Sequence, residues 1–571
     1  MWKVKQHDKN KEQRLREEGN HRFLARILSQ RPLEPEKINN FLSTDYQELN
    51  DPFKLNDCEK AARLFIEHAK NKSRVAIIGD YDCDGITSTT MLYELCRNFG
   101  LKCVPFLPSR LEHGYGLNPT TIESFKEKVQ TPPDLLFVTD CGTSNRKEVE
   151  QLKEFGIKDI IIIDHHLPYN DETLVSHNAD ALISWHFSEG FNEMCACGEV
   201  FQFIRGIRKL TKHVDPIEFL SYAAIGTLAD SQPIVGDNRI IVKNGLTKYA
   251  FDHVMASGLN SLIKAKIKYC QTITQTDVEY RIAPMINAAG RIETPDVVFR
   301  LLTECDPDLA DEMSVKVVSL NEQRKHLQSF VEGDAVEKAK ELKAENGVFI
   351  AGENYHIGIV GIVASRVVEE TGKPTLIIGY HNGVWKGSGR SIPGVNLKEI
   401  LDSCSFMFQK YGGHAAAVGV TMKEEYLDQA QEIFDKACEE YFKEHKVNSE
   451  LVRFYDASLK FNAINEEMAT LLVDKLSPYC KDHNPEPVFE LKDVKITSSK
   501  LKEGKGWRIL EFSVYKDNAL LKPQLKWFSP KFDQQIENEP VDVYFTFPQH
   551  WDNAKRFEQF DLTVVDIKKR S

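Results

Sequence analysis

The sequence predicts an α/β protein with a mostly parallel sheet in its first unit, a second α/β unit and a C-terminal β-barrel. Three observations support this fold class. Short apolar segments alternate with amphipathic stretches from about residue 73, a second alternation begins near residue 346, and short strand-like segments follow Pro487. At 571 residues the chain is too long for one hydrophobic core, so we expect several domains.

The first unit contains three apolar segments, RVAIIG (74–79), DLLFVT (134–139) and DIIIID (159–164). They are short, continuous and rich in β-branched residues, as strands buried on both faces of a parallel sheet are. The helical stretches after the first two segments end at Gly100 and Gly156, which suit the position just after a helix C-terminus. This alternation of strand and helix predicts a parallel sheet.

A long, charged helical pattern from about 300 to 345 is expected to connect the two units. In the second unit GVFIAG and PTLIIGY are expected strands, and IGIVGIVASRVVEETG is the helix between them. VFELKDVKIT, GWRILEFSVY, QLKWFS, VDVYFTF and FDLTVVDIKK are expected to form a small antiparallel barrel. The expected domains are 1–50 (N-terminal segment), 51–300, 301–345 (connecting helix), 346–448 and 449–571 (barrel).

The composition is that of an ordinary globular protein, with 42% hydrophobic and 28% charged residues. A net charge of −12 argues against a uniformly basic surface but not against a local basic groove. The first residues are polar and no apolar run could cross a bilayer, so we expect a cytoplasmic protein without a membrane partner. Twelve cysteines include no CxxC pair, and Cys195 and Cys197 are too close for a zinc knuckle, which favours reduced thiols.

Acidic and imidazole side chains follow all three strands of the first unit. They are Asp80, Asp82 and Asp84, then Asp140, then Asp164, His165 and His166. Because the carboxyl ends of parallel strands meet at one edge, we expect these groups to lie together. Crowded carboxylates repel one another unless cations neutralise them, and this ligand set suits Mn²⁺ or Mg²⁺. Two such ions about 4 Å apart activate water for attack on phosphorus, so the residues indicate a metal-dependent phosphoesterase.

These motifs resemble those of the DHH phosphoesterase superfamily. GDYDCDGIT, VTDCG and IDHH match its successive motifs. LPSRLEHGYGL, IGTLAD, PMINAAGRI, GSGRS and GGHAAAVG then follow in the order of the RecJ-like single-stranded-DNA-specific exonucleases. The resemblance covers nearly the whole chain except the first fifty residues, and it implies a DHH catalytic domain, a DHH-associated domain and an OB-like barrel.

The resemblance implies a set of residues that hold two Mn²⁺ or Mg²⁺ ions: Asp82, Asp84, Asp140, His165 and Asp230. Asp80 is expected in the same site, either as a ligand or by orienting one. His166 is expected to contact the scissile phosphate, so that the catalytic set is His166, Asp140 and Asp80. Asp230 is the last residue of IGTLAD, and helical periodicity alone would have made it a surface acid at a helix end.

The remaining motifs are expected to bind substrate. Arg110 and Arg291 are implied to lie near phosphates, where a planar guanidinium binds two oxygens at once. In the second unit, Ser388, Gly389 and Arg390 offer a hydroxyl, a close backbone approach and a charge, and His414 of GGHAAAVG is expected to face the same cleft. In the barrel, aromatic and basic residues could stack bases and follow the backbone: Trp507, Trp527, Phe528 and Trp551 with Lys505, Arg508, Lys526, Lys531 and Arg556. Packing in the barrel core is the alternative for each aromatic residue.

The sequence therefore predicts a metal-dependent exonuclease that acts on single-stranded DNA in repair or recombination. Degradation from 5′ to 3′ is implied by the resemblance alone, and a single-strand-binding protein or a helicase is a possible partner. A DHH phosphodiesterase of short RNA oligonucleotides or cyclic dinucleotides is the nearest alternative, although the barrel and the length favour a long polynucleotide. A DNA-binding replication scaffold without catalysis is a further alternative, which the complete acidic set argues against.

Overall fold

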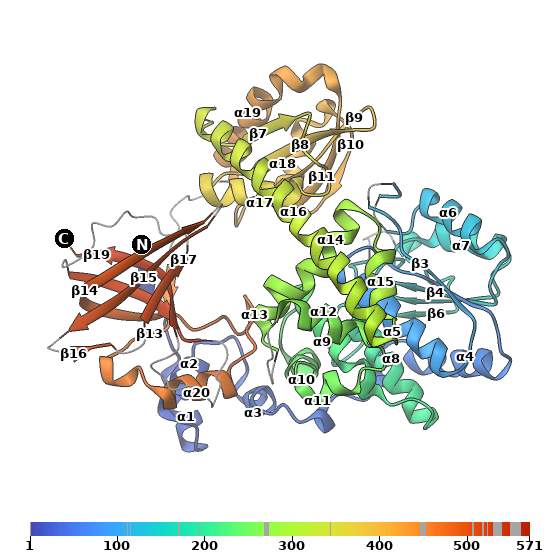
Figure 1. Ribbon diagram of the computed structural model, residues 1–571, viewed down its shortest axis with the longest axis horizontal. Helices are drawn as coiled ribbons and strands as arrows, with labels where there is room; N and C mark the ends of the chain where they lie inside the picture. Colours follow the sequence, from blue (N-terminus) through green and yellow to red (C-terminus); the bar gives the residue numbers. More distant parts are fainter. Residues whose placement is uncertain are drawn as a thin grey trace.

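The computed structural model describes residues 2–110, 112–114, 116–168, 172–191, 193–267, 273–342, 344–445, 453–504, 507–516, 519–521, 524–528, 540–548 and 561–570. Two α/β units and a barrel are joined by helices (Figure 1). None of the described helices combines the length and the apolar character that a membrane span requires.

The first unit is built on a five-stranded parallel sheet in the order β3-β2-β4-β5-β6. The expected strands are confirmed as β2 (Val75–Ile78), β4 (Leu135–Thr139) and β5 (Asp159–Ile163). Two shorter strands at the edges, β3 (Cys103–Phe106) and β6 (Ala181–Ile183), complete the sheet.

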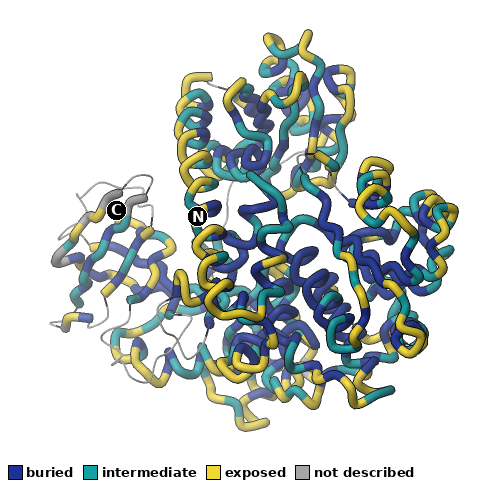
Figure 2. Tube along the Cα trace, turned by 45° about the vertical axis from the view of Figure 1, so that its right-hand side comes forward, coloured by how far each residue is buried: buried dark blue, intermediate teal, exposed yellow. Residues whose placement is uncertain are grey.

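Alternate residues of these strands enter two different cores, because successive side chains point to opposite faces. Ile77, Phe137 and Ile161 face α4 (Cys58–Lys70), α5 (Cys83–Asn98) and α8 (Ala196–Leu210). Ile78, Val138 and Ile162 face α6 (Pro119–Val129) and α7 (Arg146–Glu154). The sheet is thus the middle of three layers, and its central strands are buried (Figure 2), whereas the edge strand β3 is partly exposed.

The strand order reverses at β2, because the chain goes from β2 to β3 on one side and then to β4 on the other. Open α/β sheets bind ligands at the carboxyl ends of their strands beside such a reversal. The loops after β2 and β4, which carry the predicted acids, leave the sheet at this point. The topology therefore brings the acidic motifs to one edge.

Helix α16 (Pro307–Glu341) is the predicted connector, and it runs from the first unit to the second (Figure 1). The second unit has a mixed sheet in the order β10-β11-β9-β8-β7. Its strands are β7 (Val348–Gly352), β8 (Thr375–His381), β9 (Val384–Arg390), β10 (Phe408–Gly413) and β11 (Ala417–Met422). Helices α17 (Val360–Thr371), α18 (Leu397–Ser403) and α19 (Ala430–His445) pack against them.

The C-terminal barrel is a closed sheet of five strands in the order β14-β18-β19-β17-β15, closed by pairing of β15 with β14. The strands are β14 (Phe489–Gly504), β15 (Trp507–Lys516), β17 (Gln524–Phe528), β18 (Pro540–Thr546) and β19 (Asp561–Lys569). This is the order of an OB fold. The expectation of a wholly antiparallel barrel was wrong in one respect: β17 and β19 pair in parallel, because β18 lies between them in sequence.

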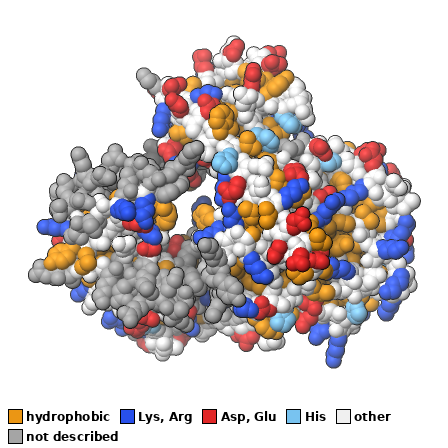
Figure 3. Space-filling view, in the orientation of Figure 1, with side chains coloured by type: hydrophobic (Ala, Val, Ile, Leu, Met, Phe, Trp, Pro, Cys, Tyr) orange, Lys and Arg blue, Asp and Glu red, His pale blue; other side chains and the backbone are white. Residues whose placement is uncertain are grey.

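The N-terminal segment packs on the barrel. Strand β1 (Trp2–Val4) pairs with β12 (Arg453–Tyr455), and the Trp2 ring stacks on Tyr544 at 4.3 Å between centroids. Helices α1 (Lys9–Glu17) and α2 (Arg22–Leu28) contribute to the same hydrophobic core as the barrel strands. Figure 3 shows an opening between the barrel side of the molecule and the first α/β unit.

Candidate metal centre

Six side chains meet at the carboxyl edge of the parallel sheet, and we call them the carboxylate cluster: Asp80, Asp82, Asp84, Asp140, His165 and Asp230. They form two groups whose ligand atoms lie within 4.8 Å of one another. One group is Asp80, Asp82 and Asp140, and the other is Asp84, His165 and Asp230. Asp140 lies between the groups, since its Oδ1 is 3.3 Å from His165 Nε2.

The acids after β2 are held by helix N-termini. Asp82 caps α5 by accepting hydrogen bonds from the backbone N–H groups of Asp84 and Gly85, at 3.0 and 3.1 Å. Asp84 accepts hydrogen bonds from the N–H groups of Ala196 and Cys197 at the start of α8, both at 2.8 Å. Helix N-termini favour negative charge, so both carboxylates are fixed in orientation.

Asp230 reaches the cluster from α9 (Leu220–Ala229), which packs against α5. A Cβ atom at Gly226 would lie 2.8 Å from Thr87 Oγ1 and 3.1 Å from Asp84 Oδ1, so glycine permits this close approach. Asp230 Oδ2 lies 3.7 Å from His165 Nε2. Two backbone positions beside the cluster, Asp140 (φ 61) and Ser231 (φ 58), are left-handed, a conformation that non-glycine residues adopt mainly where surrounding structure imposes it.

The crowded carboxyl groups of the cluster favour the binding of cations. Burial, then neighbouring carboxylates, raises the pKa of Asp80 to about 8 and that of Asp230 to about 6, and it raises the pKa of Asp82 and Asp140 as well. Asp80 Oδ1 is buried and accepts no hydrogen bond from the described residues. Carboxylates that repel one another in a buried site are neutralised by divalent cations, and oxygen with imidazole ligands suits Mn²⁺ or Mg²⁺.

His166 differs from His165 because its ring bonds Asp164. The two atoms, Nδ1 and Oδ1, are 2.7 Å apart. Although burial lowers the pKa of His166, the Asp164 charge and hydrogen bond outweigh it and raise that pKa to about 9. Burial opposes ionisation of Asp164, but the His166 charge holds the pKa of Asp164 well below its usual range. His166 is therefore a cation at neutral pH, beside the cluster.

Three predicted arginines and one unexpected arginine lie together, and we call them the arginine group: Arg110, Arg291, Arg324 and Arg390. The Arg110 guanidinium lies 5.6 Å from the centroid of the Tyr81 ring. Besides burial, its charge lowers the pKa of Arg291 and of Arg390, so all three lie near one another. Burial and then the nearby Arg110 lower the pKa of Arg291 to about 10. No salt bridge joins any of the four to a carboxylate within the described residues. Such a group of guanidinium ions favours a bound polyanion.

The two α/β units meet beside Arg291. Its Nη1 donates to the carbonyl of Gly358 at 3.2 Å, and a Cβ at Gly290 would lie 2.6 Å from the Tyr81 carbonyl oxygen. Glycine at 290 thus lets α14 (Ala283–Ile292) approach the acidic loop. On the other side, Arg390 and Ser388 face Gly361 near the start of α17. Residues 358–361 therefore lie between Arg291 on one side and Ser388 and Arg390 on the other, so these side chains are close to one another.

Gly389 has a packing role that the sequence did not indicate. It lies on β9, which pairs with β8 on one side and β11 on the other, so its backbone belongs to the sheet. A Cβ there would meet Leu376, Val418 and Leu397 side chains at 2.5–2.8 Å. Packing therefore requires glycine at 389, and the phosphate contact stays a prediction. His414 is exposed at the turn between β10 and β11, and no described contact joins it to the carboxylate cluster.

The barrel residues that were predicted to bind DNA differ in their exposure. Trp527 is 4% exposed and packs in the barrel core, whereas Phe528 is 54% exposed. Lys526 forms a salt bridge with Asp561 at 2.7 Å. The positions of Trp551, Lys505, Lys531 and Arg556, and the side chains of Trp507 and Arg508, lie outside the described residues.

Sequence reasoning missed two residues. Arg324 lies on α16, whose many charged residues give no sign of which one lies beside Arg291. His186 donates from Nε2 to the carbonyl of His165 at 2.8 Å, and its ring lies 3.8 Å from that of Trp185. A WH dipeptide just after a short strand was the only available signal.

Comparisons with known proteins agree with this geometry. The DHH family N-terminal domain matches residues 74–227, and the DHHA1 domain matches residues 345–440. The chain is 30% identical over 496 residues to the single-stranded-DNA-specific exonuclease RecJ of Haemophilus influenzae, with 83% of each chain covered. The crystal structure of Thermus thermophilus RecJ in complex with Mn²⁺ has a TM-score of 0.80 at 23% identity, covering all of this chain and 80% of that one. A crystal structure of exonuclease RecJ bound to manganese has a TM-score of 0.60 at 29% identity, covering 67% of this chain and 95% of that one.

Proposed function

The chain belongs to the RecJ family of single-stranded-DNA-specific exonucleases, and from that premise we propose that it hydrolyses phosphodiester bonds of single-stranded DNA with two divalent cations. The observation that carries the proposal is the position of the arginine group beside the carboxylate cluster, with no salt bridge from these arginines to a carboxylate among the described residues. An acidic cluster alone would repel DNA, whereas the two groups together bind cations and a phosphate chain.

In this proposal Asp80, Asp82 and Asp140 hold one Mn²⁺ or Mg²⁺ ion, and Asp84, His165 and Asp230 hold the other. When bound, such ions acidify a water and neutralise charge on the attacking and leaving oxygens. The 3.3 Å between Asp140 Oδ1 and His165 Nε2 supports a role for Asp140 in both sites, and backbone N–H donors hold the carboxylates of Asp82 and Asp84 in orientation.

His166 is proposed to contact the scissile phosphate, because Asp164 keeps its imidazole charged and oriented. The arginine group, with Ser388, would bind the phosphates next to the scissile bond. Gly389 allows the strands around Ser388 and Arg390 to pack closely. His414 would contact DNA only at a distance from the carboxylate cluster. His166, Asp140 and Asp80 thus remain the proposed catalytic set.

The wider function follows from the family. Degradation from 5′ to 3′ in repair or recombination, a cytoplasmic location, and delivery of substrate by a single-strand-binding protein or a helicase are parts of the proposal. The OB-fold barrel supports a long substrate, since such barrels bind oligonucleotides. An enzyme restricted to dinucleotides would have no use for it.

The proposal is tested with purified protein, Mn²⁺ and four substrates: end-labelled single strands, duplexes, short RNA and cyclic dinucleotides. Single strands should be degraded, 5′ and 3′ labels should report the polarity, and EDTA should stop the reaction. Asp140→Asn should lose activity, while Asp134→Asn, at the exposed opposite end of the same strand, should retain it. Activity confined to cyclic dinucleotides, or full activity in Asp140→Asn, would refute the proposal.

A further inference from the structure

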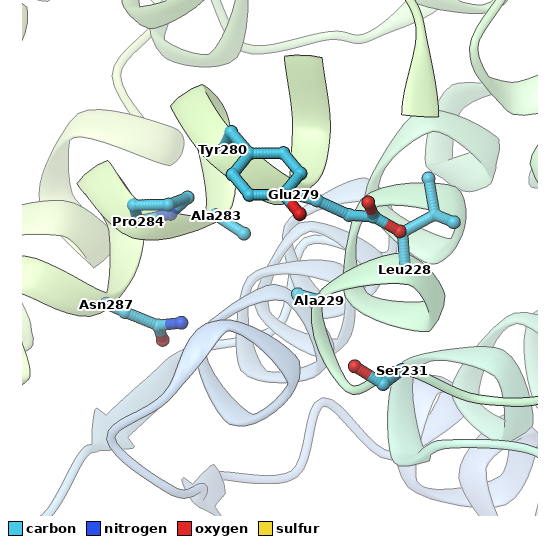
Figure 4. A pocket seen from close by; sticks show the side chains of 8 residues that line it. All are labelled: Leu228, Ala229, Ser231, Glu279, Tyr280, Ala283, Pro284 and Asn287. Carbon is cyan, nitrogen blue, oxygen red and sulfur yellow. The ribbon is translucent and has the colours of Figure 1, made fainter. Parts of the chain in front are cut away.

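A pocket of about 400 Å³ opens beside Asp230, between the end of α9 and the start of α14 (Figure 4). Ala229 and Ser231, on either side of Asp230, form one wall. Glu279 and Tyr280 form part of the opposite wall, and Asn287 lines the α14 side. The pocket is thus next to a proposed metal ligand but is not part of the ligand set.

The wall that carries Tyr280 has an unusual backbone. Residues Val278–Ile282 form a π-helix, η7, which continues into α14. Short π-helical turns are rare and often occur at functional sites. Tyr280 is 72% exposed, and no described aromatic ring packs against it. A large ring held in solvent at the mouth of a pocket is a stacking surface without a protein partner.

Asn287 contributes an unused polar group. Its Oδ1 atom is buried and has no hydrogen-bond partner among the described residues. Buried amide oxygens are normally bonded, so such an atom beside a pocket indicates a ligand with a hydrogen-bond donor. The amide can also donate, which suits the mixed donor and acceptor edge of a nucleobase.

The chemistry of the pocket excludes a phosphate. Among the described residues that line it there is neither lysine nor arginine, and Glu279 would repel an anion. Glu279 is held by Gln275, whose Nε2 donates to Oε1 at 2.6 Å. A flat, uncharged group with polar edges fits this lining, and the volume lies in the range of sites for small organic groups.

The pocket is also one nucleotide step from a phosphate contact. Asn287 and Arg291 are four residues apart on α14, so they share one face of the helix and are separated by about 6 Å along its axis. A strand whose phosphate meets Arg291 can therefore place an adjacent base against Asn287, and Tyr280 lies seven residues, about two helical turns, further toward the N-terminus.

We propose that this pocket is a base subsite that receives one unstacked nucleobase of the single strand, with Tyr280 stacking on its face and Asn287 bonding its edge. The inference rests on the proposed exonuclease function and adds a binding determinant to it. Because every base has an aromatic face and the Asn287 amide both donates and accepts, the subsite accepts all four bases. A paired base cannot enter it, so the subsite also contributes to rejection of duplexes.

The test uses short single strands with one abasic residue at successive positions from the cleaved end, in Mn²⁺. For the wild type, kcat/KM should fall roughly 5- to 100-fold at one position, the range that corresponds to one stacked base. Tyr280→Ala should lose a similar factor on the intact strand and show no further loss at that abasic position. Tyr280→Phe should behave as the wild type, and so should Tyr249→Ala, which removes a tyrosine of similar exposure elsewhere.

A second measurement does not depend on cleavage. With EDTA present, 2-aminopurine at the sensitive position should change its fluorescence on binding to the wild type and not on binding to Tyr280→Ala. If the wild type cleaves intact strands but tolerates every abasic position, or if Tyr280→Ala keeps the abasic sensitivity, the subsite is refuted and the exonuclease function stands. If the wild type does not cleave single strands at all, the proposed function fails and this inference fails with it.

Discussion

Replacing Asp80 by asparagine should stabilise the metal-free protein while it abolishes activity. Asp80 is 1% exposed, and burial together with the Asp82 charge raises its pKa from 3.8 to about 8. A raised pKa means that the folded state binds a proton more tightly than the unfolded state does. The stability that this group contributes is therefore fully present below about pH 3.8 and is lost progressively as the pH rises to about 8. At pH 7 the loss amounts to about 4 kcal/mol, from roughly three pH units at about 1.4 kcal/mol each.

The assay is urea unfolding of the first α/β unit in EDTA, for wild type and Asp80→Asn. The advantage of the variant should grow from about 2 kcal/mol at pH 5 to about 4 kcal/mol at pH 7, and it should level off above pH 8. Asparagine preserves the shape of the side chain, so little packing is lost. Adding Mn²⁺ should raise the stability of the wild type much more than that of the variant, because a bound ion neutralises the carboxylates.

Asp134→Asn is the matched control, since it removes an exposed carboxylate from the other end of β4 and should change stability little at any of these pH values. If Asp80→Asn is less stable than the wild type in EDTA at pH 7, the reasoning is wrong. The same conclusion follows if the difference between the two proteins does not vary with pH.

Three further predictions concern the surrounding residues. His166→Asn should reduce kcat by about 100-fold or more. The Mn²⁺ concentration that gives half-maximal activity, measured by titrating the rate with metal, should change little. A large shift in that concentration would show that His166 is a metal ligand. Arg324→Ala should weaken the binding of single-stranded DNA, measured by fluorescence anisotropy. The slope of log affinity against log salt concentration should become shallower by roughly 0.7, because one phosphate contact is lost. An unchanged slope would show that Arg324 does not contact a phosphate. Arg239 is 1% exposed and donates to the carbonyls at the end of α20 (Glu466–Lys475). Arg239→Met should therefore lower the free energy of unfolding by about 3–5 kcal/mol in urea, with Arg239→Lys intermediate, and a loss below 1 kcal/mol would contradict this role.

The strands that position the metal centre could be predicted from the sequence because they are continuous apolar runs that end in acids. The edge strands could not: β3 is CVPF, interrupted by Pro105, and β6 has three residues. Such segments become strands only because a neighbouring strand supplies hydrogen bonds. The parallel pairing of β17 and β19 was missed for a similar reason, since alternation along a strand does not identify its partner.

The site was predictable only where its residues follow strands. Asp230 reaches the cluster through packing of α9 on α5, and a helix end carries no local sign of that, so the motif resemblance was needed to find it. Arg324 had neither signal, because α16 is charged on most of its faces and its contact with the site depends on how α16 packs against α14. Gly389 shows a different limit: a glycine next to an arginine predicted phosphate binding, but nothing in the sequence indicated that sheet packing also requires glycine there.

A buried arginine, supported by Lys243 and Gln275, joins the barrel to the first α/β unit. Arg239 lies on α10 (Gly236–Gly245), nine residues after Asp230, and its guanidinium donates to the carbonyls of Lys475, Leu476, Ser477 and Pro478 at 2.9–3.2 Å. These carbonyls follow α20 (Glu466–Lys475), which packs in the barrel core. Helix C-termini leave such carbonyls without partners, so the arginine satisfies them and joins two cores at once. The same short segment thus carries a proposed metal ligand at one end and holds the barrel at the other, which fixes the length of strand needed to reach from the barrel to the site of hydrolysis.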